Sequence, residues 1–211
     1  MSNTIKSQDY IYIENFLDDE SCDEIIRQFK NAEQGGLPKS SAGLNDSTDE
    51  FNEVYVSSRS PLRYCYVKTD RTQRISSNGI DQLNRLTGLD WSGNINDVCF
   101  PVFEYGEDGY IETHRGRNVG YGANDYVAVL MLTKYGSDFL GGDFYLNTDA
   151  KASEDGKVIY NENESSRVFI RQKKGSLLIF NNRIHVHGTT PVKKSDKGSS
   201  IRMTTSWRMT E

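Results

Sequence analysis

The sequence predicts a mostly β domain with flanking helices, folded as a sandwich or jelly roll. Helix-like periodicity is confined to the first 94 residues, and from Asp97 onward short apolar segments alternate with turns at glycine. Only 36% of the residues are hydrophobic, but 12 tyrosines and 9 phenylalanines supply enough apolar volume for a packed core. A chain of 211 residues without internal repeats is expected to form a single domain, residues 1–211.

The N-terminal part, residues 1–94, is expected to support the β-rich part with short strands and two helices. The alternation in Tyr10–Ile13 indicates a strand. A helix is expected to begin at Asp18 or Asp19, either of which can cap it, and to end near Gly36. The Gly- and Ser-rich stretch 35–52 is expected to be a surface loop, with a substrate lid as the functional alternative. Further strands are expected around 54–56 and 62–66, and a second helix over 72–88.

The C-terminal part, residues 95–209, is expected to form the jelly-roll core. Its predicted strands run over residues 98–105, 126–132, 141–146, 167–170, 176–180, 185–192 and 200–209. Several of these segments are rich in β-branched and aromatic residues and lie next to glycine turns, as strands of a sandwich do. The polar stretch 147–165 is expected to be an exposed excursion from this core.

Charge and cysteine content exclude several classes of protein. The net charge is −5 with acidic and basic residues interspersed, whereas a nucleic-acid surface would need clustered Lys and Arg. No apolar run is long enough to span a membrane, and the N-terminus lacks the apolar segment of a secretory signal. Three cysteines without CxxC spacing indicate reduced thiols rather than a zinc site. We therefore expect a cytoplasmic protein; its oligomeric state is not readable from the sequence.

The three histidines and one late arginine are the candidate functional residues. His114 ends a strand-like stretch, and His185 and His187 lie two positions apart, so that they share a face if they are on one strand. Only one of this pair is needed as a ligand. Arg202 follows in a segment that is itself strand-like. Two neutral imidazoles and an arginine are the parts of a non-haem Fe(II) site that also holds an oxo-acid.

Five segments together resemble one enzyme superfamily: Tyr105–His114, Gly141–Phe144, Lys174–Phe180, His187–Val192 and Arg202–Trp207. This pattern is similar to that of the Fe(II)/2-oxoglutarate-dependent oxygenases, in particular their prolyl 4-hydroxylase-like branch. The likeness covers residues 95–209, and the approach to the first helix also resembles the usual N-terminal lead-in of that branch. It implies a double-stranded β-helix, the cupin-like form of the jelly roll, and the cofactors Fe(II), 2-oxoglutarate and O2.

The resemblance assigns roles by position. His114 and His187 match the two histidine ligands of the iron, and Arg202 matches the arginine that binds the distal carboxylate of 2-oxoglutarate. The planar guanidinium suits a carboxylate, and Thr204 faces the same way two positions later along a strand. Arg202 follows His187 at a longer spacing than is usual in the family, with a turn-like insert between them. Lys197 in that insert is the weaker candidate for the carboxylate role.

Gly116 is where the sequence departs from the superfamily pattern. The oxygenases place an aspartate two positions after the first histidine, which completes a two-His-one-carboxylate ligand set. Glycine has no side chain that can bind the iron, and its small size leaves a coordination position open. The positive charge of the iron is then neutralised less completely than in the oxygenases. A small residue here resembles the radical halogenases, in which chloride or bromide takes the vacant position and is transferred to a substrate radical. The sequence therefore predicts a halogenase with Gly116 at the halide-binding and catalytic position.

Two other functions stay open at this level. A hydroxylase is possible if water or another carboxylate completes the ligand set, the candidates being Glu112, Asp125 and Asp143. A catalytically inactive jelly-roll domain that binds a metabolite or a partner is less consistent with both histidines and the arginine being present. Nothing marks a surface for docking a carrier protein, so we expect a freestanding small-molecule substrate. Polar residues able to contact an amino acid or a nucleotide are Arg59, Arg63, Asn118 and Asn124.

Overall fold

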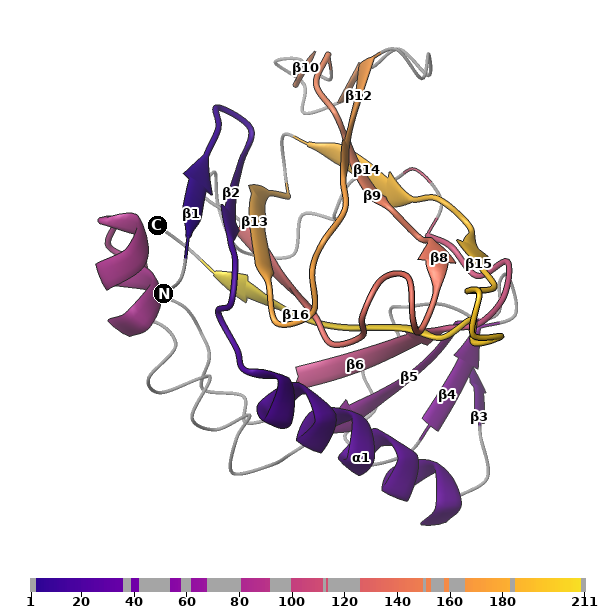
Figure 1. Ribbon diagram of the computed structural model, residues 1–211. Coiled ribbons are helices and arrows are strands. Elements are labelled where there is room, and N and C mark those ends of the chain that lie inside the picture. The colour runs from indigo at the N-terminus through magenta and orange to yellow at the C-terminus, as the bar shows by residue number, and fades with distance from the viewer. Residues whose placement is uncertain are drawn as a thin grey trace.

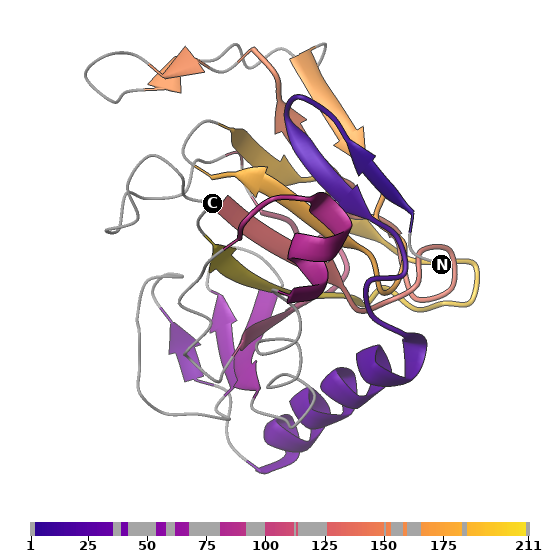
Figure 2. The same cartoon turned by 90° about the vertical axis from the view of Figure 1, so that its left-hand side faces the viewer.

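The computed structural model describes residues 3–35, 39–41, 54–57, 62–67, 81–91, 100–111, 113, 126–149, 151–152, 158–159, 166–182 and 185–209. These segments form three layers, in which helices cover one face of a large sheet and smaller sheets face its other side (Figure 1). Figure 2 shows helix α1 (Asp19–Gly35) and the hairpin of β10 (Lys151–Ala152) and β11 (Val158–Ile159) at opposite ends of the molecule.

In the described part of the chain, the large sheet contains nine strands in the order β1-β2-β13-β7-β16-β6-β5-β4-β3. All neighbours are antiparallel except β3 and β4, which are parallel. In that spatial order the strands are β1 (Thr4–Lys6), β2 (Tyr10–Ile13), β13 (Leu177–Asn181), β7 (Tyr126–Met131), β16 (Arg202–Met209), β6 (Phe100–Tyr105), β5 (Leu62–Val67), β4 (Val54–Ser57) and β3 (Lys39–Ser41).

Among the residues that the structure describes, two short sheets build the opposing layer. One has the order β12 (Arg167–Ile170), β9 (Phe144–Asn147) and β14 (Val186–Thr189); the other pairs β15 (Val192–Lys193) with β8 (Leu140–Gly141). The prediction of one strand over 185–192 is therefore wrong. The chain bends between β14 and β15 because Pro191 has no N–H for a ladder, and the amide N–H groups of Gly142 and Asp143 bond to Pro191 O and Thr190 Oγ1 instead.

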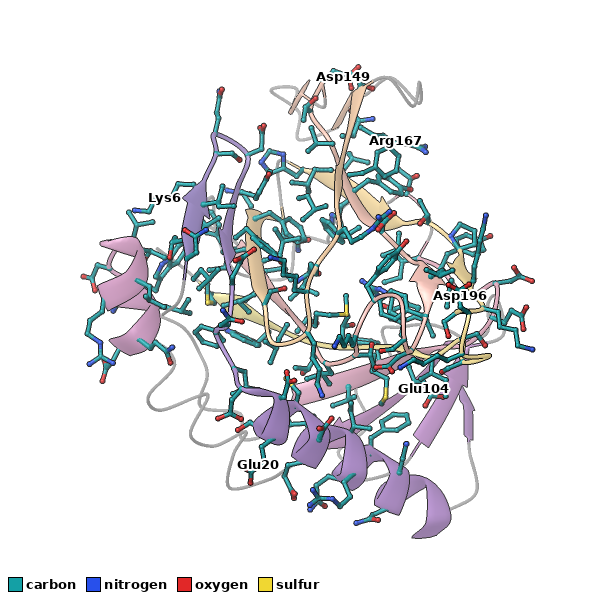
Figure 3. The ribbon with its side chains drawn as sticks, viewed as in Figure 1. Lys6, Glu20, Glu104, Asp149, Arg167 and Asp196 are labelled. Atoms are coloured by element: carbon teal, nitrogen blue, oxygen red, sulfur yellow. The ribbon has the colours of Figure 1, made fainter. Side chains whose placement is uncertain are left out.

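Helix α1 begins and ends where the sequence predicts. The Oδ1 atom of Asp18 accepts a hydrogen bond from the backbone N–H of Ser21 over 2.7 Å, which caps the first turn. Glu20 lies in that turn on the side away from the sheet (Figure 3). The opposite face of the helix buries three side chains, Cys22, Ile25 and Phe29, in the core cluster beneath the large sheet. Of the second predicted helix, residues 81–87 are helical and residues 72–80 lie outside the described segments.

Strict alternation along the large sheet divides the core into two halves. On β13, Leu177 and Ile179 pack toward the helices, whereas Leu178 and Phe180 pack against the smaller sheets. Successive side chains on β16 are divided in the same way, with Met203, Trp207 and Met209 in the helix-side cluster. Arg202 and Thr204 therefore face the space between the two sheet layers, which is where a jelly roll holds ligands.

The N-terminal part is more than a support, since β1 to β5 extend both edges of the large sheet. Within the predicted loop or lid 35–52, residues 39–41 form the edge strand β3, and most of the remainder lies outside the described residues. The prediction of a single domain with a division at residue 95 stays a prediction. No helix among the described segments is long and apolar enough to cross a membrane.

Candidate functional site

Arg202 is a buried cation. Its side chain lies in β16, only 1% exposed, and its guanidinium carbon is 4.9 Å from the ring centroid of Tyr105. The Nε atom has no hydrogen-bond partner, and no carboxylate among the described residues forms an ion pair with this arginine. Burial lowers the pKa of Arg202, an effect that the neighbouring Tyr105 and Asp143 oppose. A charge left this poorly compensated indicates a site for an anionic ligand.

Tyr105 and Thr204 complete the polar cluster around this arginine. Tyr105 on β6 is paired with Arg202 in the strand ladder, and Thr204 lies two positions further along β16 on the same face. Burial raises the pKa of the Tyr105 hydroxyl, while the charge of Arg202 and hydrogen bonding by Thr204 lower it. The hydroxyl therefore stays protonated. Sequence reasoning gave Tyr105 no role, because its proximity to Arg202 depends on which strands are neighbours.

The backbone at residue 142 lies close to the Arg202 side chain because residue 142 is a glycine. A Cβ atom at this position would lie 2.7 Å from Cδ and 3.3 Å from Nε of Arg202. The residue also has a φ of 60°, in the left-handed region that favours glycine. The turn between β8 and β9 is thus pressed against the stem of Arg202, which fixes the direction of its guanidinium.

His187 is held in the state that a metal ligand requires. Its Nδ1 atom lies 3.0 Å from the backbone carbonyl oxygen of His185. A carbonyl can only accept, so Nδ1 carries the hydrogen, and in a neutral ring Nε2 then carries the lone pair. The ring is stacked on Phe144, with centroids 5.6 Å apart, and meets the edge of Phe180 at 4.6 Å. Both phenylalanines belong to the core between the sheet layers, so His187 faces the same interior as Arg202.

His185 differs from His187 although only one residue separates them. It precedes β14 rather than lying in it, and its backbone N–H donates to the Asn181 carbonyl oxygen over 3.0 Å. Burial lowers the pKa of His185, so the ring is neutral near pH 7. Its backbone carbonyl, which orients His187, is therefore its clearest contribution to the candidate site.

The segment that leads toward His114 is fastened to the strand of His187. The backbone N–H of Ile111 donates to Thr189 Oγ1 over 2.8 Å, and the Thr189 N–H donates to the Ile111 carbonyl oxygen over 3.0 Å. Two residues later, Thr113 Oγ1 lies 2.7 Å from the hydroxyl of Tyr145. His114 and Gly116 themselves lie outside the described residues, and among those described no three His, Cys, Asp or Glu side chains gather around a metal-sized space.

This architecture is similar to that of several solved structures. No family model and no curated protein sequence matches the chain. A prolyl hydroxylase from Trichoplax adhaerens, solved with a hypoxia-inducible-factor peptide, superimposes with a TM-score of 0.60 at 18% identity, covering 97% of this chain and 84% of that one. The epimerase SnoN of nogalamycin biosynthesis gives 0.65 at 12% identity, with coverage of 97% and 77%. The viral collagen prolyl hydroxylase of Paramecium bursaria Chlorella virus-1 gives 0.54 at 15%, with coverage of 97% and 96%.

The chain has the double-stranded β-helix fold. The large sheet and the facing sheets of β12-β9-β14 and β15-β8 are its two layers. This confirms the fold class predicted from the sequence. Identities of this size establish the fold alone, so the chemistry has to be argued from the residues inside it.

Within the double-stranded β-helix, the rival residues proposed from the sequence are less well placed. Both carboxylate oxygens of Asp143 accept hydrogen bonds from Arg171, over 2.8 Å each, so this aspartate is already engaged. Lys197 is exposed in the turn before β16, whereas Arg202 is buried. Four of the remaining candidates, Glu112, Asp125, Asn118 and Asn124, lie outside the described residues, as does Arg59. Arg63 lies in β5, opposite Glu104 in the ladder.

Proposed function

We propose that this protein is an Fe(II)/2-oxoglutarate-dependent oxidoreductase that acts on a small molecule. The observation that carries the proposal is the buried Arg202 with its unpartnered Nε atom, flanked by the hydroxyls of Tyr105 and Thr204. A guanidinium and two hydroxyls match the carboxylate of a short dicarboxylic acid. In the absence of such a ligand the buried charge is costly, because Tyr105 and Asp143 only partly offset its burial and no described carboxylate forms an ion pair with it.

The donor set also fits a divalent iron. His187 would bind it through Nε2, and His114 is the proposed second imidazole. Iron, 2-oxoglutarate and O2 would together supply the oxidising chemistry. The chain contributes orientation, because the His185 carbonyl holds one imidazole and Gly142 holds the guanidinium stem. It also contributes a dry environment, because Phe144 and Phe180 flank the ring of His187 and exclude water from that side.

We further propose that the outcome of the reaction is halogenation. Residue 116 is a glycine, so the position two residues after His114 offers no carboxylate. Chloride or bromide would fill the space beside the metal and supply the missing negative charge. The engagement of Asp143 by Arg171 supports this reading, because it removes the one described candidate for a substitute ligand. Amino acids and nucleotides remain the proposed substrate classes.

Hydroxylation is the second candidate function. It is favoured by the fold comparison, since the chain superimposes on several prolyl hydroxylases. In that case Glu112, Asp125 or water would complete the ligand set in place of the halide. The two functions share the metal and the 2-oxoglutarate site and differ only in what occupies the position next to Gly116.

Assays with a panel of free amino acids and nucleotides test the proposal. The purified protein, Fe(II), 2-oxoglutarate, O2 and either chloride or bromide are incubated with each compound, and succinate and products are measured by mass spectrometry. We expect succinate together with a product that carries the isotope pattern of the halogen supplied. Lys197→Met should behave as the wild type, and Arg202→Met should form no succinate. A product that gains only oxygen under every halide condition would establish hydroxylation, and an absence of 2-oxoglutarate binding would overturn the proposed function.

A further inference from the structure

Tyr145 occupies an unusual position on the outer face of the small sheet. Its neighbours on β9, Phe144 and Leu146, point into the core between the layers, so Tyr145 points the other way. The residue is nevertheless buried, with only 5% of its surface exposed. The guanidinium of Arg167 lies 4.5 Å from the ring centroid, and the ring of Phe169 lies 5.8 Å away. Arg167 is at the upper end of the sheet in Figure 3. Covered in this way, the tyrosine ring has little freedom to move.

The ring lies directly across the backbone that follows His187. In the ladder, Tyr145 is opposite Gly188, the residue after the proposed metal ligand. A Cβ atom on Gly188 would be 2.4 Å from the hydroxyl oxygen of Tyr145 and 2.7 Å from its Cζ. Only glycine leaves enough space at position 188 for this tyrosine. The Tyr145 hydroxyl therefore lies against the backbone of β14 at Gly188.

The hydroxyl then reaches a third segment of the chain. It forms a 2.7 Å hydrogen bond with Thr113 Oγ1, and Ile111 in the same segment is bonded twice to Thr189. Residues 111–113 are thus bonded directly to Thr189 of β14 and, through the Tyr145 hydroxyl, to β9 opposite Gly188. Thr113 directly precedes His114 in the sequence, so this hydrogen bond anchors the described residue next to that proposed ligand.

We propose that Tyr145 is a positioning residue for the metal site, through its hydrogen bond to Thr113. This inference rests on the proposed function, in which His114 and His187 bind Fe(II). The tyrosine spans the two chain segments that carry these histidines and sets the spacing between them. Outer residues that orient ligands commonly change metal affinity by 10-fold or more when they are removed.

Four variants test this role: Tyr145→Phe, Thr113→Val, Thr113→Ser and, as a matched control, Tyr12→Phe. The first two remove the hydrogen bond, and Thr113→Ser keeps the hydroxyl. The control removes a buried tyrosine hydroxyl that accepts from the backbone N–H of Lys173 over 3.0 Å. Anaerobic Fe(II) titrations give affinity, the absorption spectrum of the Co(II)-loaded protein reports ligand geometry, and thermal unfolding verifies that each variant is folded.

We expect Tyr145→Phe and Thr113→Val to weaken metal binding about 10-fold and to alter the Co(II) spectrum. Thr113→Ser and Tyr12→Phe should match the wild type. The double variant Tyr145→Phe/Thr113→Val should be no weaker than either single variant, because one hydrogen bond is shared. Unchanged affinity and spectrum in both single variants would overturn the inference while leaving the proposed function intact. A wild-type protein that binds neither Fe(II) nor Co(II) would overturn both.

Discussion

The Nδ1 atom of His187 and the backbone carbonyl oxygen of His185 are 3.0 Å apart, and this contact favours His187 over His185 as the proposed metal ligand. The carbonyl fixes the hydrogen on Nδ1 and leaves Nε2 of the neutral ring with a lone pair. Because the acceptor belongs to the backbone, replacing the side chain of residue 185 leaves it in place.

Replacing the two histidines should therefore have unequal effects. We expect His187→Gln to abolish Fe(II) binding, because a glutamine amide is a poor substitute for imidazole. His185→Gln should retain Fe(II) affinity within about threefold, since its carbonyl still orients His187. Anaerobic calorimetric titration of both variants checks this, with circular dichroism to establish folding. The assignment is wrong if His185→Gln loses the metal and His187→Gln keeps it.

Replacing Arg202 should separate stability from ligand binding. Arg202→Met removes a buried, poorly compensated charge and keeps most of the side-chain volume. We expect the ligand-free variant to gain on the order of 1–4 kcal/mol in free energy of unfolding. It should bind no 2-oxoglutarate, whereas the wild type should be stabilised by that ligand. Denaturant unfolding with and without 2-oxoglutarate measures both effects. An Arg202→Met variant that is less stable than the ligand-free wild type, or that still binds 2-oxoglutarate, would argue against a carboxylate site at Arg202.

The contact between Gly142 and Arg202 can be isolated with a second glycine. Gly142 and Gly136 both have positive φ, at 60° and 87°, but a Cβ on Gly136 would meet nothing within 4 Å. Gly136→Ala should cost only the backbone strain of about 1–2 kcal/mol. Gly142→Ala adds a clash with Cδ of Arg202, which we expect to cost a further 1–3 kcal/mol or so and to weaken 2-oxoglutarate binding. Equal 2-oxoglutarate affinities in the two variants would show that the clash does not reach the guanidinium.

Buried Cys22 gives a prediction about alkaline pH. Burial raises the pKa of its thiol from 9.0 to about 12. Between these values the unfolded thiol loses its proton while the folded one keeps it, so the unfolded state binds fewer protons. The free energy of unfolding should consequently fall as pH rises above about 9, and this cysteine should contribute no pH dependence below that value. In denaturant titrations at alkaline pH, the free energy of unfolding of Cys22→Ala should decline less steeply with pH than that of the wild type. An equal decline in both proteins would refute the raised pKa of Cys22.

Much of the strand pattern was predictable because it is local. Leu177–Phe180 is apolar on both faces, and the structure buries both, toward the helices and toward the smaller sheets. The capping aspartate before α1 was predictable for the same reason. The break at Thr190 and Pro191 was missed because the flanking residues look equally strand-like, although the proline was a signal against a continuous ladder.

The roles of Tyr105 and Tyr145 could not be predicted from local pattern. Tyr105 meets Arg202 only because β6 and β16 are neighbours, and Tyr145 meets Thr113 across separate segments. Alternation within a strand gives a residue's face but not the partner opposite it. Arg202 was predicted from its motif to bind a carboxylate; the structure shows that it is buried, and its role stays a prediction.

Iron X-ray absorption spectroscopy on the anaerobic Fe(II)–2-oxoglutarate complex in bromide would show whether a halide takes the place of a carboxylate ligand, because bromine is a strong and distinctive scatterer. We expect a bromide bonded to iron in the wild type, which Gly116→Asp should remove by supplying a carboxylate oxygen in its place. An iron coordinated only by nitrogen and oxygen in the wild type, with a spectrum unchanged by bromide, would contradict this expectation.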